Sequence, residues 1–81
     1  MSLDKAQAVC EYLVQQLVDD PTAVGVAATQ TGSKLRLDVT VGEGDMGRVI
    51  GRRGRVAGAI RTVVRAAGYE EGTSIEVEFI D

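Results

Sequence analysis

The sequence predicts an α+β fold, a two-layer sandwich in which three helices cover one face of a mixed three-stranded sheet. Three observations lead to this prediction. Apolar residues near the N-terminus recur every three or four positions, which is the period of an amphipathic helix. Two later segments, 35–41 and 75–79, alternate between apolar and polar residues as half-buried strands do. The helical stretch between these segments is divided in two by a pair of glycines.

The first half of the chain predicts a helix followed by a hairpin. The helix is expected to run to about Val18, with an inner face made of Leu3, Ala6, Val9 or Cys10, Leu13 and Leu17. Asp19, Asp20 and Pro21 end it, because the residue before a proline disfavours helical geometry and proline has no N–H to donate. A strand over 24–31, a turn at 32–34 and a strand over 35–41 then form the hairpin. The second strand has one apolar face, so helices should cover only one side of the sheet.

The second half predicts two helices and a strand. Asp45 is expected to cap a short helix over 46–50, and a longer helix over 55–67 follows the glycine turn. The inner face of the longer helix is expected to hold Val56, Ile60, Val63 and Ala67, and Gly68 to close it in the left-handed conformation. The last strand covers 74–80. Because two helices intervene, a right-handed crossover makes the second and third strands parallel. The element order is α-β-β-α-α-β.

Length and composition limit the class of protein. A chain of 81 residues has room for one modest core, so we expect residues 1–81 to form a single domain. Stability at this length is marginal unless a partner contributes, which keeps self-association open. Asp4 lies near the N-terminus and no long apolar run is present, so we expect neither a signal peptide nor a membrane span, and a cytoplasmic location by default.

Catalytic and metal sites are not expected. Cys10 is the only cysteine and the sequence contains no histidine, which excludes an internal disulfide, a histidine-containing zinc site and a Cys/His nucleophile. The carboxylate pairs 19–20 and 70–71 lie at expected element ends, where solvated turn residues are the simpler interpretation. We therefore expect no enzymatic activity and no metal cofactor.

Charge is distributed unevenly along the chain. The formal net charge is −3, which argues against nucleic acid if the chain is treated as a uniform sphere. Six of the nine basic residues, however, lie in an acid-free stretch between 46 and 69: Arg48, Arg52, Arg53, Arg55, Arg61 and Arg65. Screening acts over about 8 Å, so a local basic patch can bind phosphates while distant acids limit unspecific contacts. A merely solvated helix face is the alternative interpretation.

Residues 42–47 match the pattern G-x-G-x-x-G between a predicted strand and a helix, so a dinucleotide site has to be weighed. Glu43 and Asp45 would place negative charge against a pyrophosphate, and Gly51 breaks the following helix. No acid follows about 20 residues later to hold a ribose. We therefore expect no nucleotide cofactor and no small-molecule substrate.

The glycine turn at 51–54 has the features of a site for a polyanion backbone. Gly51 and Gly54 let the main chain turn sharply and approach a ligand closely, and Arg52 and Arg53 project from the turn toward phosphates. Apolar residues flank the turn and offer a platform for unstacked bases: Val49, Ile50, Val56 and Ala57.

This turn carries a family resemblance. The run Val49-Ile50-Gly51-Arg52-Arg53-Gly54 matches V-I-G-x-x-G, the signature of KH domains, and residues 47–62 resemble the small bacterial single-domain KH proteins called KhpA. The predicted element order is that of the type II KH fold, so the resemblance covers nearly the whole chain. A bare G-x-x-G is weak evidence, whereas the longer run with matching topology is specific.

The resemblance implies a function and partners. It implies binding of single-stranded RNA, with about four nucleotides in a groove between the two motif helices and the neighbouring strand. The phosphate clamp would be Gly51, Arg52, Arg53 and Gly54, with Arg48, Ile50 and Arg55 beside it, and the variable loop would be 68–73. The family pairs with itself and with a second KH protein, KhpB, and is linked to RNA chaperoning or post-transcriptional regulation and to cell elongation.

A few positions leave alternatives open. Many KH domains have isoleucine where this chain has Ala57, so the apolar floor is either shallower or supplied by Ile60. Gly58, inside a helix, either permits a close backbone contact or is a tolerated weakness that costs about 1 kcal/mol relative to alanine. Tyr69 is either a base contact or a structural residue at the helix end. The second functional hypothesis is a dimerising adaptor that uses the KH surface mainly for protein contacts.

Overall fold

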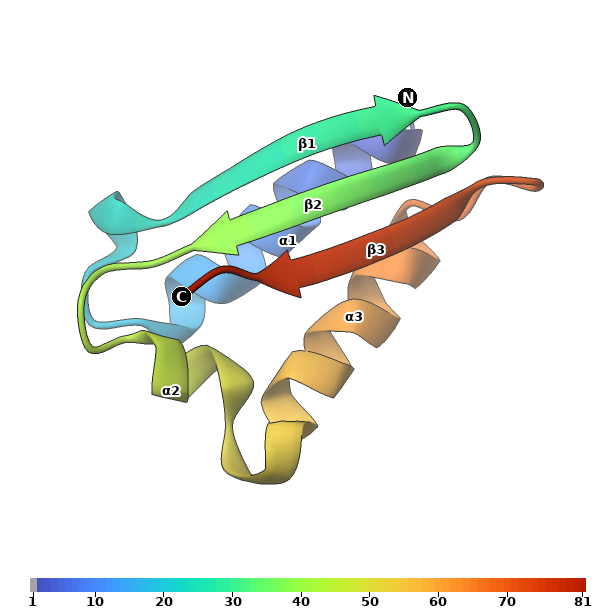
Figure 1. Cartoon of the computed structure of the whole chain (residues 1–81). Coiled ribbons are helices and arrows are strands. Elements are labelled where there is room, and N and C mark those ends of the chain that lie inside the picture. Colours follow the sequence, from blue (N-terminus) through green and yellow to red (C-terminus); the bar gives the residue numbers. More distant parts are fainter. Residues whose placement is uncertain (1) are drawn as a thin grey trace.

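The computed structural model describes residues 2–81, and within them the elements follow in the predicted order. The helices are α1 (Ser2–Leu17), α2 (Met46–Ile50) and α3 (Arg55–Ala67), and the strands are β1 (Gly25–Thr31), β2 (Lys34–Thr40) and β3 (Ser74–Phe79). Two short 3-10 helices complete the list, η1 (Pro21–Ala23) and η2 (Arg52–Gly54). Figure 1 shows the strands side by side in one layer, with α1 and α3 in a second layer behind them. The predicted α+β two-layer fold is confirmed.

The sheet is mixed, and its strands lie in the order β1-β2-β3. β1 and β2 pair antiparallel, with Val26 opposite Val39, and β2 and β3 pair parallel, with Leu37 opposite Val77. The hairpin and the parallel crossover are therefore both confirmed, and the strand bounds differ from the prediction by about one residue at an end. The central position of β2 puts the most regular apolar alternation of the chain in the middle of the sheet.

The core lies between the two layers, and one face of each strand contributes to it. The main buried residues are Leu35, Leu37, Val39, Ile75 and Val77 of the sheet, Ala6, Cys10 and Val14 of α1, and Ile60 and Val64 of α3. The opposite face of the sheet is polar. Lys34 Nζ lies 2.9 Å from Glu76 Oε1, and Arg36 Nε lies 2.8 Å from Asp38 Oδ1. The hydrogen bond from Lys34 holds the pKa of the Glu76 carboxyl below its usual value.

The inner faces of two helices are rotated relative to the prediction. In α1, Val14 is fully buried, whereas the neighbouring Leu13, which was predicted to face the core, is only partly buried and Leu17 is 38% exposed. In α3, Val64 is fully buried while Val63 is 47% exposed. Each step along a helix turns the side chain by about 100°, so a choice between two adjacent apolar residues changes the face. Packing against the sheet selected the other member of each apolar pair.

Two predicted helix ends were also wrong. Gly68 follows α3 with φ −101°, so it does not adopt the left-handed conformation. Asp45 makes no side-chain cap to α2. Its carboxylate, which is 4% exposed, instead accepts hydrogen bonds from the backbone N–H groups of Asp19 (3.3 Å) and Asp20 (3.2 Å). This side chain therefore joins the segment after α1 to the start of α2.

Candidate nucleic-acid interface

The turn between α2 and α3 has a backbone that requires its glycines. Gly51 has φ 74° and ψ 177°, a combination that essentially only glycine adopts, and Gly54 is left-handed with φ 72° and ψ 14°. A Cβ on Gly51 would overlap Val56 Cγ2 and lie 2.7 Å from Val56 Cβ, whereas one on Gly54 would meet no atom within 4 Å. Gly51 is therefore needed for space and for conformation, and Gly54 for conformation alone.

Three arginines at this turn have unpaired side chains. The side chains of Arg52, Arg53 and Arg55 are exposed, and no hydrogen bond or ion pair in residues 2–81 engages them. Arg53 itself adopts the left-handed conformation, with φ 57° and ψ 26°. The backbone N–H groups of Arg52 and Arg53 have no acceptor within the described residues. Guanidinium groups and free backbone amides are the donors that bind phosphate oxygens, and both are present at this turn.

Arg48 differs from these three, because it is already paired. Its Nη2 donates to Asp19 Oδ2 at 3.0 Å, and its Nε lies 3.5 Å from Asp45 Oδ1. The side chain is still 54% exposed. Arg48 thus fastens α2 to the segment after α1, and its charge is partly neutralised before any ligand arrives.

Arg61 and Arg65 also have partners, and these join α3 to the edge of the sheet. Arg61 Nε donates to the backbone oxygen of Val77 at 3.1 Å, and Arg65 Nε donates to that of Ile75 at 3.0 Å. The Arg61 guanidinium also lies 5.2 Å from the centre of the Phe79 ring. One helical turn separates the two arginines, as two residues separate their acceptors along β3. In the sequence they are only members of the basic stretch; their four-residue spacing is compatible with this bridging but does not by itself predict it.

The apolar platform is smaller than expected. Val49 and Ala57 are buried in the core, and Ile60 is buried as well, so none of them offers a surface to a base. Ile50 and Val56 are partly exposed and remain beside the turn. At Ala57, where many KH domains have isoleucine, the side chain packs in the core and does not face a ligand. Ile60 does not supply an exposed apolar floor in its place.

A second surface was not found by the sequence reasoning. An apolar hollow of about 250 Å³ lies between α1 and α3, lined by Leu13, Gln16, Leu17, Val56, Ala59, Ile60 and Val63. The exposed residues Leu17 and Val63, which the sequence assigned to the core, form part of it. It became recognisable only once the rotation of both helices was known.

Other kinds of site find little support in residues 2–81. No group of three or more His, Cys, Asp or Glu side chains there is arranged to hold a metal ion. None of the helices described has the length and apolar character needed to span a bilayer. Burial raises the pKa of the Cys10 thiol to about 11, so this thiol is protonated and unreactive near neutral pH.

Comparison with known proteins decides the family. A family model described as "KhpA/KhpB, KH domain" matches residues 7–79. The chain belongs to the KhpA/KhpB KH-domain family. The match includes both motif helices and all three strands, so the resemblance seen in the glycine turn extends over the KhpA/KhpB fold as a whole. No solved structure gives a significant match.

Several curated KhpA/KhpB relatives have similar sequences. "RNA-binding protein KhpA" of Listeria monocytogenes serovar 1/2a is 42% identical over 69 residues, covering 85% of this chain and 91% of the relative. The protein of the same name from Bacillus subtilis is 40% identical over 70 residues, covering 86% of each. That of Halalkalibacterium halodurans is 36% identical over 75 residues, covering 93% of this chain and 99% of the relative. These relatives are described as RNA-binding proteins and not as enzymes, in agreement with the expected lack of catalysis.

Proposed function

We propose that this chain binds single-stranded RNA, with the turn from Gly51 to Gly54 holding the phosphate backbone. The observation that carries the proposal is the set of exposed, unpaired guanidinium groups of Arg52, Arg53 and Arg55. They lie at a turn whose first residue, Gly51, has a conformation that essentially only glycine adopts. The names of the KhpA relatives support the same ligand. About four nucleotides would then lie in the groove between the motif helices and β3.

The arginines have different roles in this proposal. Arg52 and Arg53 contact phosphates, Arg55 adds charge at the start of α3, and Ile50 provides apolar contact beside the turn. Arg48 positions α2, because its guanidinium is engaged by Asp19 and Asp45. The acids on the outer face of the sheet, such as Glu76 and Glu78, disfavour RNA there and leave the turn as the preferred surface.

The experiment is a charge reversal at the turn. Arg52→Asp with Arg53→Asp keeps both glycines, and we expect it to abolish binding of a single-stranded uridine decamer while the circular dichroism spectrum stays native. The wild-type slope of log affinity against log salt should be about −2, since three arginines each contribute about −0.7 for a single strand.

A matched control separates local charge from net charge. Lys5→Asp with Arg36→Asp changes the net charge by the same amount on exposed residues of α1 and of the outer sheet face. We expect this variant to bind the decamer nearly as well as the wild type. Equal losses in both variants, or no loss in the turn variant, would contradict the proposal.

A second function is favoured by the apolar hollow between α1 and α3. Exposure of Val63 and Leu17 beside Val56 on a small protein suggests a dimerising adaptor, pairing either with a second copy or with a KhpB-type KH protein. Sedimentation analysis tests it: Val63→Glu should shift a wild-type dimer toward the monomer, and Ala66→Glu, on the same helix but outside the hollow, should not. A wild-type chain that stays monomeric, alone and with a KhpB-type protein, removes this function.

The cellular role proposed with RNA binding is that of a cytoplasmic RNA chaperone or post-transcriptional regulator acting in cell elongation. It follows from the family resemblance alone. Cell length in a strain that carries the Arg52→Asp, Arg53→Asp variant in place of the wild type tests it, because loss of RNA binding should then reproduce the phenotype of the deletion.

A further inference from the structure

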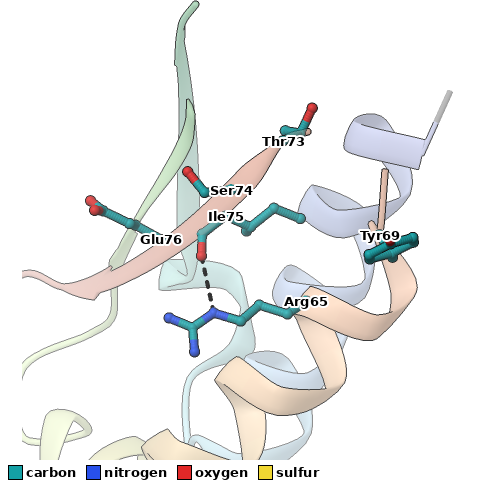
Figure 2. A pocket seen from close by; sticks show the side chains of 6 residues that line it. All are labelled: Arg65, Tyr69, Thr73, Ser74, Ile75 and Glu76. Carbon is teal, nitrogen blue, oxygen red and sulfur yellow. Dashed lines mark hydrogen bonds between the residues drawn. The ribbon is translucent and has the colours of Figure 1, made fainter. Parts of the chain in front are cut away.

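A hollow of about 390 Å³ lies at the end of α3 opposite to the glycine turn. It is lined by Arg65, Tyr69, Thr73, Ser74, Ile75 and Glu76, and so lies between the C-terminal end of α3 and the beginning of β3. Figure 2 shows Tyr69 and Arg65 on the helix side of the hollow and Ile75 on the strand side. The volume lies within the range of small-ligand sites, about 300–1,000 Å³.

The Tyr69 ring is available for contact. Tyr69 is 72% exposed, so its ring does not fix the end of the helix by packing into the core, which was one of the two roles open to it from the sequence. Its backbone N–H is held by the oxygen of Ala66 at 3.4 Å, one turn earlier. In Figure 2 the side chain of the buried Ile75 points toward the ring. An anchored backbone with an exposed aromatic ring beside an apolar floor is suited to stacking of a flat partner.

Arg65 forms the wall of the hollow and is held in place. Its Nε donates to the backbone oxygen of Ile75 at 3.0 Å, which leaves the terminal Nη groups without a partner among the described residues. The nearby carboxylate of Glu76 does not take them, because it points away in Figure 2 and is paired with Lys34 at 2.9 Å. A fixed guanidinium with free donors can hydrogen-bond the edge of a heterocyclic base.

Charge distinguishes a base from a second phosphate here. Glu76 lines the hollow, and Glu70 and Glu71 follow Tyr69 directly in the sequence, so this end of the molecule carries negative charge that opposes an anion. A nucleobase is uncharged, so the carboxylates do not repel it, and its π face can stack on an aromatic ring. We propose that the hollow accepts one unstacked base of a bound single-stranded RNA, stacked on Tyr69 with its edge toward Arg65. This inference rests on the proposed function, and it adds a binding site for a nucleotide beyond the glycine turn.

The position of the hollow sets a length requirement. The 13 residues of α3 separate it from the turn, which corresponds to about 20 Å at a rise of about 1.5 Å per residue. About four nucleotides fill the groove at the turn, so a tetramer bound there has no nucleotide left for the hollow. A uridine decamer can occupy the turn and the hollow together.

The chain offers a direct spectroscopic test. It contains no tryptophan and two tyrosines, so Tyr12→Phe leaves Tyr69 as the only tyrosine. In that background we expect the decamer to quench the tyrosine emission and the tetramer, at equal occupancy, to leave it largely unchanged. Emission that is unaffected by a saturating decamer overturns the proposal.

Affinity measurements complete the test. Tyr69→Ala should weaken binding of the decamer about tenfold, in the range measured for loss of one base–aromatic stack, and should not weaken binding of the tetramer. Tyr69→Phe should restore the affinity, because it keeps the ring. Tyr12→Ala, at the other exposed tyrosine, is the control and should have no effect.

The outcomes separate this inference from the proposed function. If reversal of Arg52 and Arg53 abolishes binding while Tyr69→Ala leaves the decamer affinity unchanged, the RNA site at the turn stands and the base site is wrong. If Tyr69→Ala alters only sedimentation, the hollow is a protein contact and the proposal is also wrong. If the wild type binds no RNA at all, both fail.

Discussion

Asp45 Oδ2 accepts a hydrogen bond from the backbone N–H of Asp20 at 3.2 Å, although the two residues are 25 positions apart in the sequence. Asp45 lies at the start of α2, and Asp20 lies just after α1. The neighbouring N–H of Asp19 donates to Oδ1 of the same carboxylate, and Arg48 pairs with both Asp19 and Asp45. One buried carboxylate thus holds the helix that carries the glycine turn against the end of α1.

Removal of this carboxylate should destabilise the protein. We expect Asp45→Ala to lower the free energy of unfolding by about 1–3 kcal/mol, because two partly buried backbone amides lose their acceptor. Urea unfolding followed by circular dichroism measures the effect. Asp38→Ala, which removes a partly exposed carboxylate that pairs with Arg36 on the outer face of the sheet, should change the free energy by less than about 1 kcal/mol. Equal effects of the two substitutions would show that the Asp45 contacts contribute little.

The two turn glycines should differ in their tolerance to substitution. Gly51→Ala combines a disallowed conformation with overlap on Val56, and we expect it to lower the free energy of unfolding by about 2–5 kcal/mol. Gly54→Ala introduces only left-handed strain and should cost about 1–2 kcal/mol. Gly54→Asn should cost less than Gly54→Ala, because asparagine tolerates that conformation better. Chemical denaturation of the three variants checks this order, and a reversed order of Gly51→Ala and Gly54→Ala contradicts it.

Gly58 should be a site where alanine stabilises the protein. It is exposed in the interior of α3, and a Cβ there would meet no atom within 4 Å, so no close contact inside this chain requires glycine. We expect Gly58→Ala to raise the free energy of unfolding by about 1 kcal/mol. Thermal unfolding measures it. If alanine instead weakens self-association without raising the stability of the monomer, the glycine belongs to an interface between chains.

Stability should fall at alkaline pH through Cys10. Burial, with a smaller contribution from the neighbouring Glu11, raises the pKa of this thiol from 9.0 to about 11. The folded state therefore keeps the thiol proton that the unfolded state loses above pH 9, so this contribution to stability is complete below pH 9 and is lost as the pH approaches 11. Two pKa units correspond to about 2–3 kcal/mol.

The measurement compares two pH values in two proteins. We expect the free energy of unfolding of the wild type to fall by about 2 kcal/mol more than that of Cys10→Ala between pH 8 and pH 10.5. The difference between the proteins isolates the thiol from the tyrosines and lysines that also titrate in this range. Parallel pH profiles for the two proteins would exclude the role given to Cys10.

Much of the fold follows from local patterns in the sequence. The alternation in β2 and β3 placed Leu37 and Val77 in the core, because side chains of a strand point to opposite faces with a period of two. The bounds of α2 and α3 were correct because Gly51 and Gly54 interrupt the helical backbone between them. The sequence did not determine which face of each helix packs against the sheet, because adjacent apolar residues such as Val63 and Val64 fit a 3.6-residue period almost equally well.

The sequence by itself determined the order of the elements and the position of the glycine turn, because these depend on local backbone preference and on short-range periodicity. It also determined the mixed sheet, because a crossover through two helices is right-handed and makes the strands that it joins parallel. Only the tertiary structure decided which arginines already have partners. The sequence placed Arg52 and Arg53 on the turn with Arg48 and Arg55 beside it, but it does not show which of the six arginines are paired, because their partners come from distant parts of the chain. Asp19 and Asp45 engage Arg48, the edge of β3 engages Arg61 and Arg65, and Arg52, Arg53 and Arg55 remain free at the turn. A hydrogen bond between residues far apart in sequence exists only once packing has fixed both, which is why the tertiary structure and not the sequence identified the free arginines.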